Sequence, residues 1–178
     1  ITTYRDLIQK GRTRAALGEL QALIGGEALL PPYAHYRVLT NIAAVHFKAG
    51  RYEQALDYTR TAQAMRPDDP KAMTNLAFAE LATGDRDGAA RRAEDVLARH
   101  PGHSRAASVL LQARSKDLTL SDPFTLVPAA THSTDEFAIA AVLFLRERNA
   151  ASWRALAARA SIEHPDNDVI SRFAAEAE

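Results

Sequence analysis

Apolar residues recur along most of the chain at the three- or four-residue intervals of an amphipathic helix. Turn-forming residues interrupt this pattern at regular places, with Gly50 and Gly84 after two of the periodic segments and Pro67 and Pro101 after the segments that follow them. We therefore predict an all-α protein built from antiparallel helix hairpins. The predicted helices cover residues 34–49, 52–65, 70–83, 86–99, 104–116, 134–148, 150–163 and 167–177.

A repeat of 34 residues organises the centre of the chain, because residues 40–50 return with substitutions as residues 74–84. The same offset pairs Asn41 with Asn75, Ala55 with Ala89 and Pro67 with Pro101. The 34-residue spacing, with glycine and proline at fixed positions in it, resembles that of the tetratricopeptide repeat family. The resemblance implies a right-handed superhelical solenoid. His46 and Glu80 depart from the family pattern, which prefers an aromatic residue there, and His46 is interpreted as a packing residue.

Weaker copies of the repeat flank this centre, since residues 11–17 resemble residues 50–56 at an offset of 39. Prolines at 123 and 128 predict that residues 118–133 form an irregular connector rather than a helix. The predicted organisation is a degenerate hairpin and loop at 1–35, two well-formed repeats at 36–103, a third first helix and connector at 104–133, and a degenerate hairpin with a capping helix at 134–178.

Composition narrows the classes of protein that fit. The chain has no cysteine, which excludes disulfides and thiolate chemistry and fits a cytoplasmic location. The longest apolar run covers residues 137–145, whereas a membrane-spanning helix needs about 20 apolar residues, so we expect no membrane insertion. Residues 118–178 are acidic, with 5 Lys or Arg against 9 Asp or Glu. Because the chain begins with Ile1, we expect it to be a piece of a longer protein.

Histidine and carboxylate spacings favour structural roles over catalysis. His100 and His103 share one predicted turn without a third metal ligand nearby, and His164 stands at a predicted helix end. Carboxylates occur near predicted helix starts, where aspartate caps free N–H groups: Asp68 with Asp69, Asp85 with Asp87, and Asp166 with Asp168. Phosphate-loop and hydrolase motifs are absent from the sequence. We expect a non-enzymatic protein with no cofactor and no metal.

The resemblance also implies a concave groove, lined by positions 2, 5, 6, 9, 12 and 13 of each repeat. Over three repeats these eighteen positions hold five cations and no carboxylate. Phe47, Phe78 and Leu81 at these positions are either core residues or anchors for an apolar side chain of a ligand. The candidate peptide-binding residues are Arg37, Thr40, Asn41, Phe47, Lys48, Lys71, Thr74, Asn75, Phe78, Arg105, Gln112 and Lys116.

A basic groove predicts a protein partner with an acidic segment or a free C-terminal carboxylate. Arg37, Asn41, Asn75 and Arg105 resemble most of the carboxylate clamp of co-chaperone repeat domains, but Val109 stands where that clamp has a cation. Two alternatives remain open: a regulatory arm whose groove packs on its own longer chain, and self-association. Nucleic-acid binding ranks last, because no stacking aromatics are interleaved with the cations.

Overall fold

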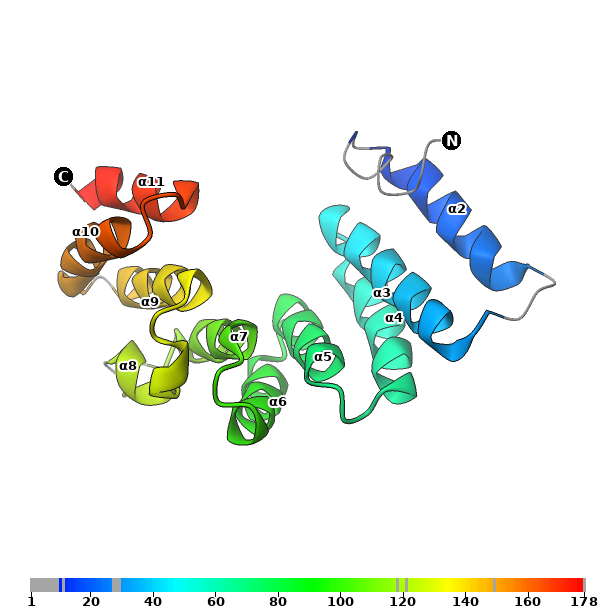
Figure 1. Cartoon of the computed structure of the whole chain (residues 1–178), viewed down its shortest axis with the longest axis horizontal. Helices are drawn as coiled ribbons and strands as arrows, with labels where there is room; N and C mark the ends of the chain where they lie inside the picture. Colours follow the sequence, from blue (N-terminus) through cyan, green and yellow to red (C-terminus); the bar gives the residue numbers. More distant parts are fainter. Residues whose placement is uncertain are drawn as a thin grey trace. The chain divides into compact units, whose positions relative to one another are not determined.

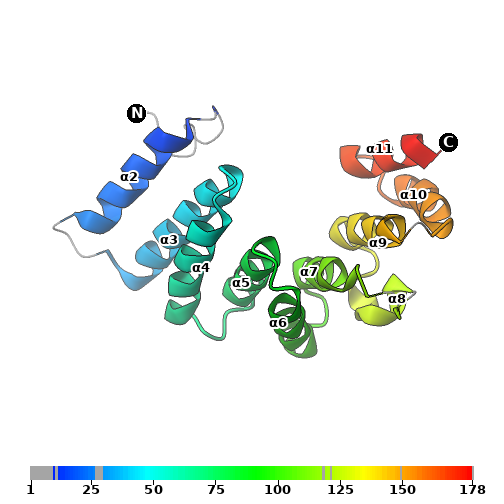
Figure 2. The same ribbon diagram turned by 180° about the vertical axis from the view of Figure 1, so that it is seen from behind.

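The structure is a computed structural model that describes residues 10, 12–26, 30–117, 119–120, 122–148 and 150–177. Over these residues the chain forms ten α-helices, one short 3-10 helix and no β-strand (Figures 1 and 2). The prediction of an all-α fold is confirmed. None of the described helices is both long enough and apolar enough to cross a bilayer.

The helices belong to two compact units, residues 1–83 (unit 1) and residues 84–178 (unit 2). The division between them falls inside the two repeats predicted at residues 36–103. The four segments of the predicted domain organisation stay a prediction.

Unit 1 contains four described helices: α2 (Thr13–Gly25), α3 (Pro32–Lys48), α4 (Tyr52–Met65) and α5 (Pro70–Ala82). Helix α3 begins two residues before its predicted start, because Pro32 fits the first turn, where its fixed φ is helical and its missing N–H is not needed. Asp69 caps α5 as predicted, since its Oδ1 accepts hydrogen bonds from the N–H groups of Lys71 (2.9 Å) and Ala72 (3.1 Å). Only part of the predicted hairpin and loop at 1–35 is described, because residues 1–9, 11 and 27–29 lie outside the described residues.

The core of unit 1 is a set of apolar clusters between neighbouring helices. Helices α2 and α3 bury Ala16, Leu17 and Leu20 against Val38, Ile42 and Val45. Helices α3 and α4 lie side by side in both views (Figures 1 and 2). Ala55 and Ala62 on α4 are 0% and 1% exposed, and their small side chains allow the two helices to approach closely.

Helix α3 ends in a glycine turn. Gly50 has φ +69°, a left-handed conformation that most residues with a Cβ avoid. The N–H of Gly50 donates to the carbonyl of Phe47 (3.0 Å) and the N–H of Arg51 donates to the carbonyl of His46 (2.9 Å). These bonds satisfy the last carbonyls of α3 within the turn itself, so α4 begins directly afterwards at Tyr52.

Unit 2 contains α6 (Arg86–Arg99), α7 (Ser104–Arg114), α8 (Pro123–Leu126), the 3-10 helix η1 (Ala129–Thr131), α9 (Asp135–Glu147), α10 (Ser152–Glu163) and α11 (Asp168–Ala177). The prediction of a non-helical connector at 118–133 is wrong in one respect, because α8 and η1 lie within it. Pro123 takes the first position of α8 and Asp122 caps it by accepting from the N–H of Phe124 (2.9 Å).

The core of unit 2 contains small residues on α6 and α7 and aromatic residues on α9. Helices α6 and α7 pack through alanines such as Ala89, Ala93 and Ala107, which have no exposed surface. Phe137 and Phe144 of α9 are the largest fully buried side chains. Helix α11 packs on α9 and α10. Its Ile170 is fully buried in a cluster with alanines of both helices.

Candidate binding surface

Helix α3 presents one exposed stripe to solvent. Its other sides hold the buried residues of unit 1, so the periodicity of the helix leaves a single line of accessible positions. The hydroxyl of Thr40 on this line donates to the carbonyl of Arg37 (2.9 Å). The α3 stripe consists of Arg37, Thr40, Asn41, Ala44, Phe47 and Lys48, all of them exposed or half-buried.

Helix α5 is buried on most of its surface and keeps one accessible line, the α5 stripe. Thr74, a predicted binding residue, is not on it, because its side chain is 1% exposed and its hydroxyl donates to the carbonyl of Pro70 (2.7 Å). Thr74 is therefore a packing residue that offers no surface to a ligand. The α5 stripe consists of the exposed Lys71 and the half-buried Asn75, Phe78, Leu81 and Ala82.

An aromatic contact brings the two stripes of unit 1 together. The rings of Phe47 and Phe78 have centroids 5.2 Å apart and an interplanar angle of 59°. Phe47 also packs against the buried cluster of Leu56, Leu76 and Ala79. Both interpretations of these aromatics given by the sequence therefore apply in part: each ring is half-buried in the core and half-open to solvent.

Helix α7 carries the corresponding positions of unit 2. Arg105 is exposed, and Gln112 is half-buried with its Nε2 donating to Ser108 Oγ (3.0 Å). Val109, at the position where a clamp would have a cation, is 1% exposed. The helix ends at Arg114, two residues before its predicted end, so the exposed Lys116 lies in the turn after it. Arg105, Ser108, Gln112 and Lys116 are named the α7 stripe.

The cations of the α3 and α5 stripes are accessible to a ligand. Within the described part of the chain, no carboxylate forms an ion pair with Arg37, Lys48 or Lys71, and all three side chains are exposed or half-buried. None of the stripes of α3, α5 and α7 contains an aspartate or glutamate. Considering the described residues, the charged groups of the α3 and α5 stripes are therefore all positive and none is neutralised by an ion pair.

Comparison with known proteins identifies the repeats. Residues 46–113 match the family model described as tetratricopeptide repeat. This part of the chain is similar to tetratricopeptide repeats. Repeats of this family generally mediate protein–protein interactions and are typically non-catalytic scaffolds. No curated protein matches the chain.

Solved tetratricopeptide repeat structures share the fold. A tetratricopeptide repeat protein from Parabacteroides merdae aligns with a TM-score of 0.68 and 16% identity, covering 98% of this chain and 69% of that chain. A thermophilic tetratricopeptide repeat protein from Thermus thermophilus aligns with a TM-score of 0.65 and 18% identity, covering 80% of each chain. At these identities the likeness concerns the helix arrangement alone.

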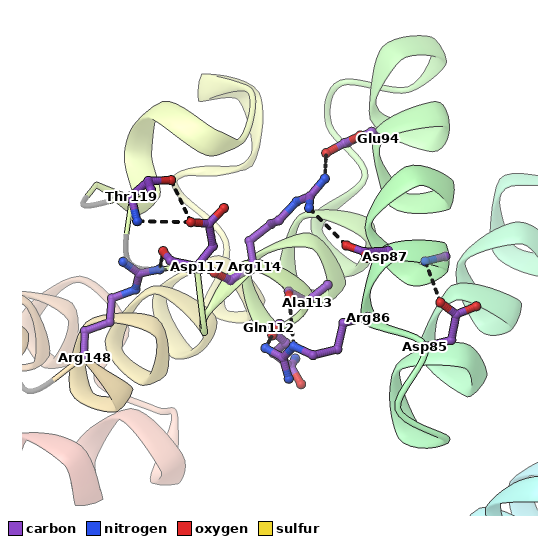
Figure 3. Close-up of polar contacts among 11 residues, drawn as sticks. Asp85, Arg86, Asp87, Glu94, Gln112, Ala113, Arg114, Asp117, Thr119 and Arg148 are labelled. Atoms are coloured by element: carbon purple, nitrogen blue, oxygen red, sulfur yellow. Dashed lines mark hydrogen bonds and ion pairs between the residues drawn. The ribbon is translucent and has the colours of Figure 1, made fainter.

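The end of α7, which closes the regular repeats, is held by arginines that the sequence did not point to. Arg86, the first residue of α6, donates to the carbonyls of Gln112 and Ala113 and to Ser115 Oγ (2.8 Å) (Figure 3). Arg148, which follows α9, donates to the carbonyls of Arg114 (3.1 Å), Asp117 and Leu120. The guanidinium of Arg148 also lies 4.1 Å from the ring centroid of Phe144.

Two further side chains fix the turn after α7. Arg114 forms ion pairs with Glu94 (3.2 Å) and Asp87 (3.5 Å) of α6 (Figure 3). The Asp117 carboxylate accepts from the hydroxyl (2.6 Å) and N–H (3.0 Å) of Thr119, and these hydrogen bonds lower the pKa of Asp117. These contacts give the polar side chains near the end of α7 a structural role.

A cluster of aromatics and charges at the start of α3 was also missed. The guanidinium of Arg66 lies 5.6 Å from the ring centroid of Tyr33 and 5.3 Å from that of Tyr36, and it pairs with Asp69 (2.9 Å). Burial and the nearby Asp69 raise the pKa of Tyr36. The only local signal for this cluster was the predicted cap at Asp69.

Histidines and carboxylates take structural positions in the described residues. Asp85 caps α6 by accepting from the N–H of Gly88 (2.9 Å), and His103 accepts from the N–H of Ala106 (3.3 Å) at the start of α7. His46 fills a packing position as predicted, 7% exposed and stacked on Tyr58 with centroids 5.4 Å apart. No group of three or more His, Asp or Glu in the described ranges is placed to hold a metal ion.

A pocket of about 390 Å³ lies in unit 2 beside α8, α9 and α10. Its apolar lining comes from Phe124, Leu145 and Leu156. The guanidinium of Arg159, also part of the lining, is paired with Glu163 (3.2 Å). The pocket therefore has a mixed lining, because Asp122 and Ser152 also contribute to it and Arg159 already has an ion-pair partner.

Proposed function

We propose that the chain is a non-catalytic interaction module that binds an acidic segment of a partner protein. The proposed contact surface is the α3 and α5 stripes of unit 1. The α7 stripe of unit 2, with Arg105, Gln112 and Lys116, is proposed to bind the same class of ligand. The module needs no cofactor, and a cytoplasmic location fits a chain that has no cysteine to oxidise.

The observation that carries this proposal is the set of accessible cations in unit 1 that form no ion pair with a described residue. Arg37, Lys48 and Lys71 can each pair with a ligand carboxylate without first breaking an internal salt bridge. Asn41 and Asn75 lie on the same stripes and add amide groups that donate to carboxylates. The half-open Phe47 and Phe78 rings supply an apolar contact beside the charges.

A peptide titration tests the proposal. A fluorescein-labelled, glutamate-rich peptide is titrated with the chain at low and physiological ionic strength, next to the same peptide with glutamine in place of glutamate. We expect the glutamate peptide to bind and its affinity to fall with salt, because the contacts are exposed charges. Equal binding of the two peptides would overturn the proposal.

Alanine variants locate the contact. Arg37→Ala and Lys71→Ala are each expected to weaken binding by about 3- to 10-fold, as expected for a charged contact at a solvent-exposed site. Arg60→Ala removes an exposed cation from α4, on another face of unit 1, and serves as the matched control. The proposal fails if the control loses as much affinity as the stripe variants.

Amidation of the peptide C-terminus separates a general acidic ligand from a clamp for a free carboxylate. Because Val109 is apolar and buried where the clamp needs a cation, we expect amidation to weaken binding less than the exchange of glutamate for glutamine. Arg105→Ala, with Arg91→Ala on α6 as its control, tests the α7 stripe in the same assay.

A further inference from the structure

Helix α9 in unit 2 carries an exposed stripe of the opposite charge. Glu136, Leu143 and Glu147 lie on one line of the helix, at positions i, i+7 and i+11, and all three are exposed. Leu143 is 38% exposed, which is unusual for a leucine in a helix whose aromatic residues are fully buried. These three residues form the α9 stripe.

The charged residues at the side of this stripe are already used inside unit 2. Asp135 pairs with His164 (2.6 Å) and accepts from Asn167 Nδ2 (2.8 Å), while Arg146 pairs with Glu176 of α11 (2.7 Å). Glu136 and Glu147 differ from them, since neither forms an ion pair with any residue that the structure describes. The two carboxylates, with Leu143 between them, therefore have no ionic partner among the described residues of unit 2.

The α3 stripe of unit 1 has the same spacing with complementary chemistry. Arg37, Ala44 and Lys48 also stand at i, i+7 and i+11. At about 1.5 Å of rise per residue, both the two cations and the two carboxylates are about 16 Å apart along their helices. Both ion pairs can therefore form at once. Ala44, exposed between the two cations, leaves room for the larger Leu143 side chain.

We propose that the α9 stripe of one copy of the chain docks on the α3 stripe of a second copy. This inference rests on the proposed function, because it makes a second copy one of the acidic partners of the basic surface. The uneven charge of the sequence agrees with it, since residues 118–178 have 5 Lys or Arg and 9 Asp or Glu.

Each copy carries both stripes, so two copies can exchange the contact reciprocally around a twofold axis. The contact is small and its charges are exposed, so a dissociation constant on the order of 10 to 100 µM is expected at physiological salt. Addition of salt should shift the equilibrium toward monomer.

Paired charge reversals test the docking by sedimentation velocity over a range of concentrations. One variant carries Arg37→Glu and Lys48→Glu, and the other carries Glu136→Lys and Glu147→Lys. Each variant alone presents stripes of equal sign and is expected to associate at least about 100-fold more weakly than the wild type, since like charges across an interface repel. An equimolar mixture of the two restores opposite signs at both contacts of a mixed dimer, and we expect it to associate more strongly than either variant alone.

The matched control is the variant Glu53→Lys with Asp57→Lys on α4, which changes the net charge by the same amount at exposed positions outside both stripes. It should associate like the wild type. A wild type that stays monomeric at several hundred µM, variants that associate like the wild type, or a mixture that associates no better than its components would each overturn the docking.

The glutamate-peptide titration distinguishes a failure of the docking from a failure of the proposed function. The variant with Glu136→Lys and Glu147→Lys retains its α3 and α5 stripes and is expected to bind the peptide at least as tightly as the wild type. If it binds the peptide and the wild type is monomeric, the docking is wrong and the proposed function stands. If the wild type dimerises through charges outside α3 and α9, the docking is also wrong.

Discussion

Helices α3 and α7 are both predicted to be first helices of repeats, but the hydrogen bonds at their C-terminal ends differ. Helix α3 ends in the turn around Gly50, where backbone N–H groups donate to the last carbonyls of the helix. Helix α7 has no glycine after it. The N–H groups of Ser115 and Asp117 donate to its last carbonyls, and the side chains of Arg86 and Arg148 add further donors to these carbonyls and to those of the following turn.

The difference shows where the regular repeat stops. A glycine turn satisfies the helix end with neighbouring residues and returns the chain at once, so α4 begins at Tyr52. At α7 additional donors come from α6 and from the residue after α9, and the chain does not reverse immediately. Instead it forms the connector with α8 and η1 before α9 begins at Asp135.

Among the substitutions that test this comparison, removal of Arg148 is expected to lower stability most. Arg148→Ala removes the side-chain donor of the Leu120 carbonyl, takes one of two donors from the carbonyls of Arg114 and Asp117, and removes the contact with Phe144, which should lower the free energy of unfolding by about 2 to 4 kcal/mol. Urea denaturation measures the change. Arg91→Ala, an exposed arginine of α6, should change stability by less than about 0.5 kcal/mol. Similar values for both variants would show that the arginine contacts do not hold the end of α7.

An enlarged side chain at Ala55 should have the next largest effect, because it tests the hairpin that the glycine turn closes. Ala55 is 0% exposed, so Ala55→Leu forces a larger side chain between packed helices and should destabilise the chain by about 1 to 3 kcal/mol. Peptide binding should weaken with it, since the stripes depend on helix packing. Ala64→Leu, at an exposed position of the same helix, should leave both the melting temperature and the affinity unchanged. A retained melting temperature in Ala55→Leu would contradict the repeat alignment.

The same contrast explains which features were predictable from the sequence. Helix periodicity and the glycine at position 50 are local signals, and they placed α3, α4, α5 and α6 within two residues of their observed ends. Arg86 and Arg148 act on residues 26 to 34 positions away, and no local pattern indicates such contacts. The connector was predicted to be irregular because of Pro123 and Pro128, and α8 within it is too short to show a helical period in the sequence.

The candidate surface was predictable to a similar extent. The groove positions implied by the resemblance to the repeat family identified most of the accessible positions of α3, α5 and α7, because helical periodicity fixes which side of a helix faces the core. It failed at Thr74, Val109 and Ser115, which are buried. These residues lie at the edges of their stripes, where burial depends on what packs beside the helix and not on the helix itself.

Substitution of Gly50 should have a smaller effect and tests the left-handed turn directly. An added Cβ at Gly50 would have no neighbour within 4 Å, so only the positive φ of +69° opposes Gly50→Ala. The expected loss is about 1 to 2 kcal/mol in the free energy of unfolding. Gly102 also has open space around its Cβ position but no positive φ, so Gly102→Ala should be neutral or slightly stabilising. Equal effects of the two substitutions in urea denaturation would contradict the role assigned to the turn.

The smallest effect is expected from replacement of His46 near the end of α3, because the effect of its titration on stability is absent at neutral pH. Burial, with a lesser contribution from Arg51, lowers the pKa of His46 below the value of 6.5 for a free histidine. The unfolded chain therefore binds this proton more readily than the folded chain. The stability due to neutral His46 is complete above pH 6.5 and is lost as the pH falls from there through the lower folded pKa. His46→Phe keeps the stacking on Tyr58 and removes the titration, so it should lose less stability than the wild type between about pH 7.5 and pH 5. Identical pH profiles of the two proteins in urea denaturation would show that His46 does not titrate differently in the folded chain.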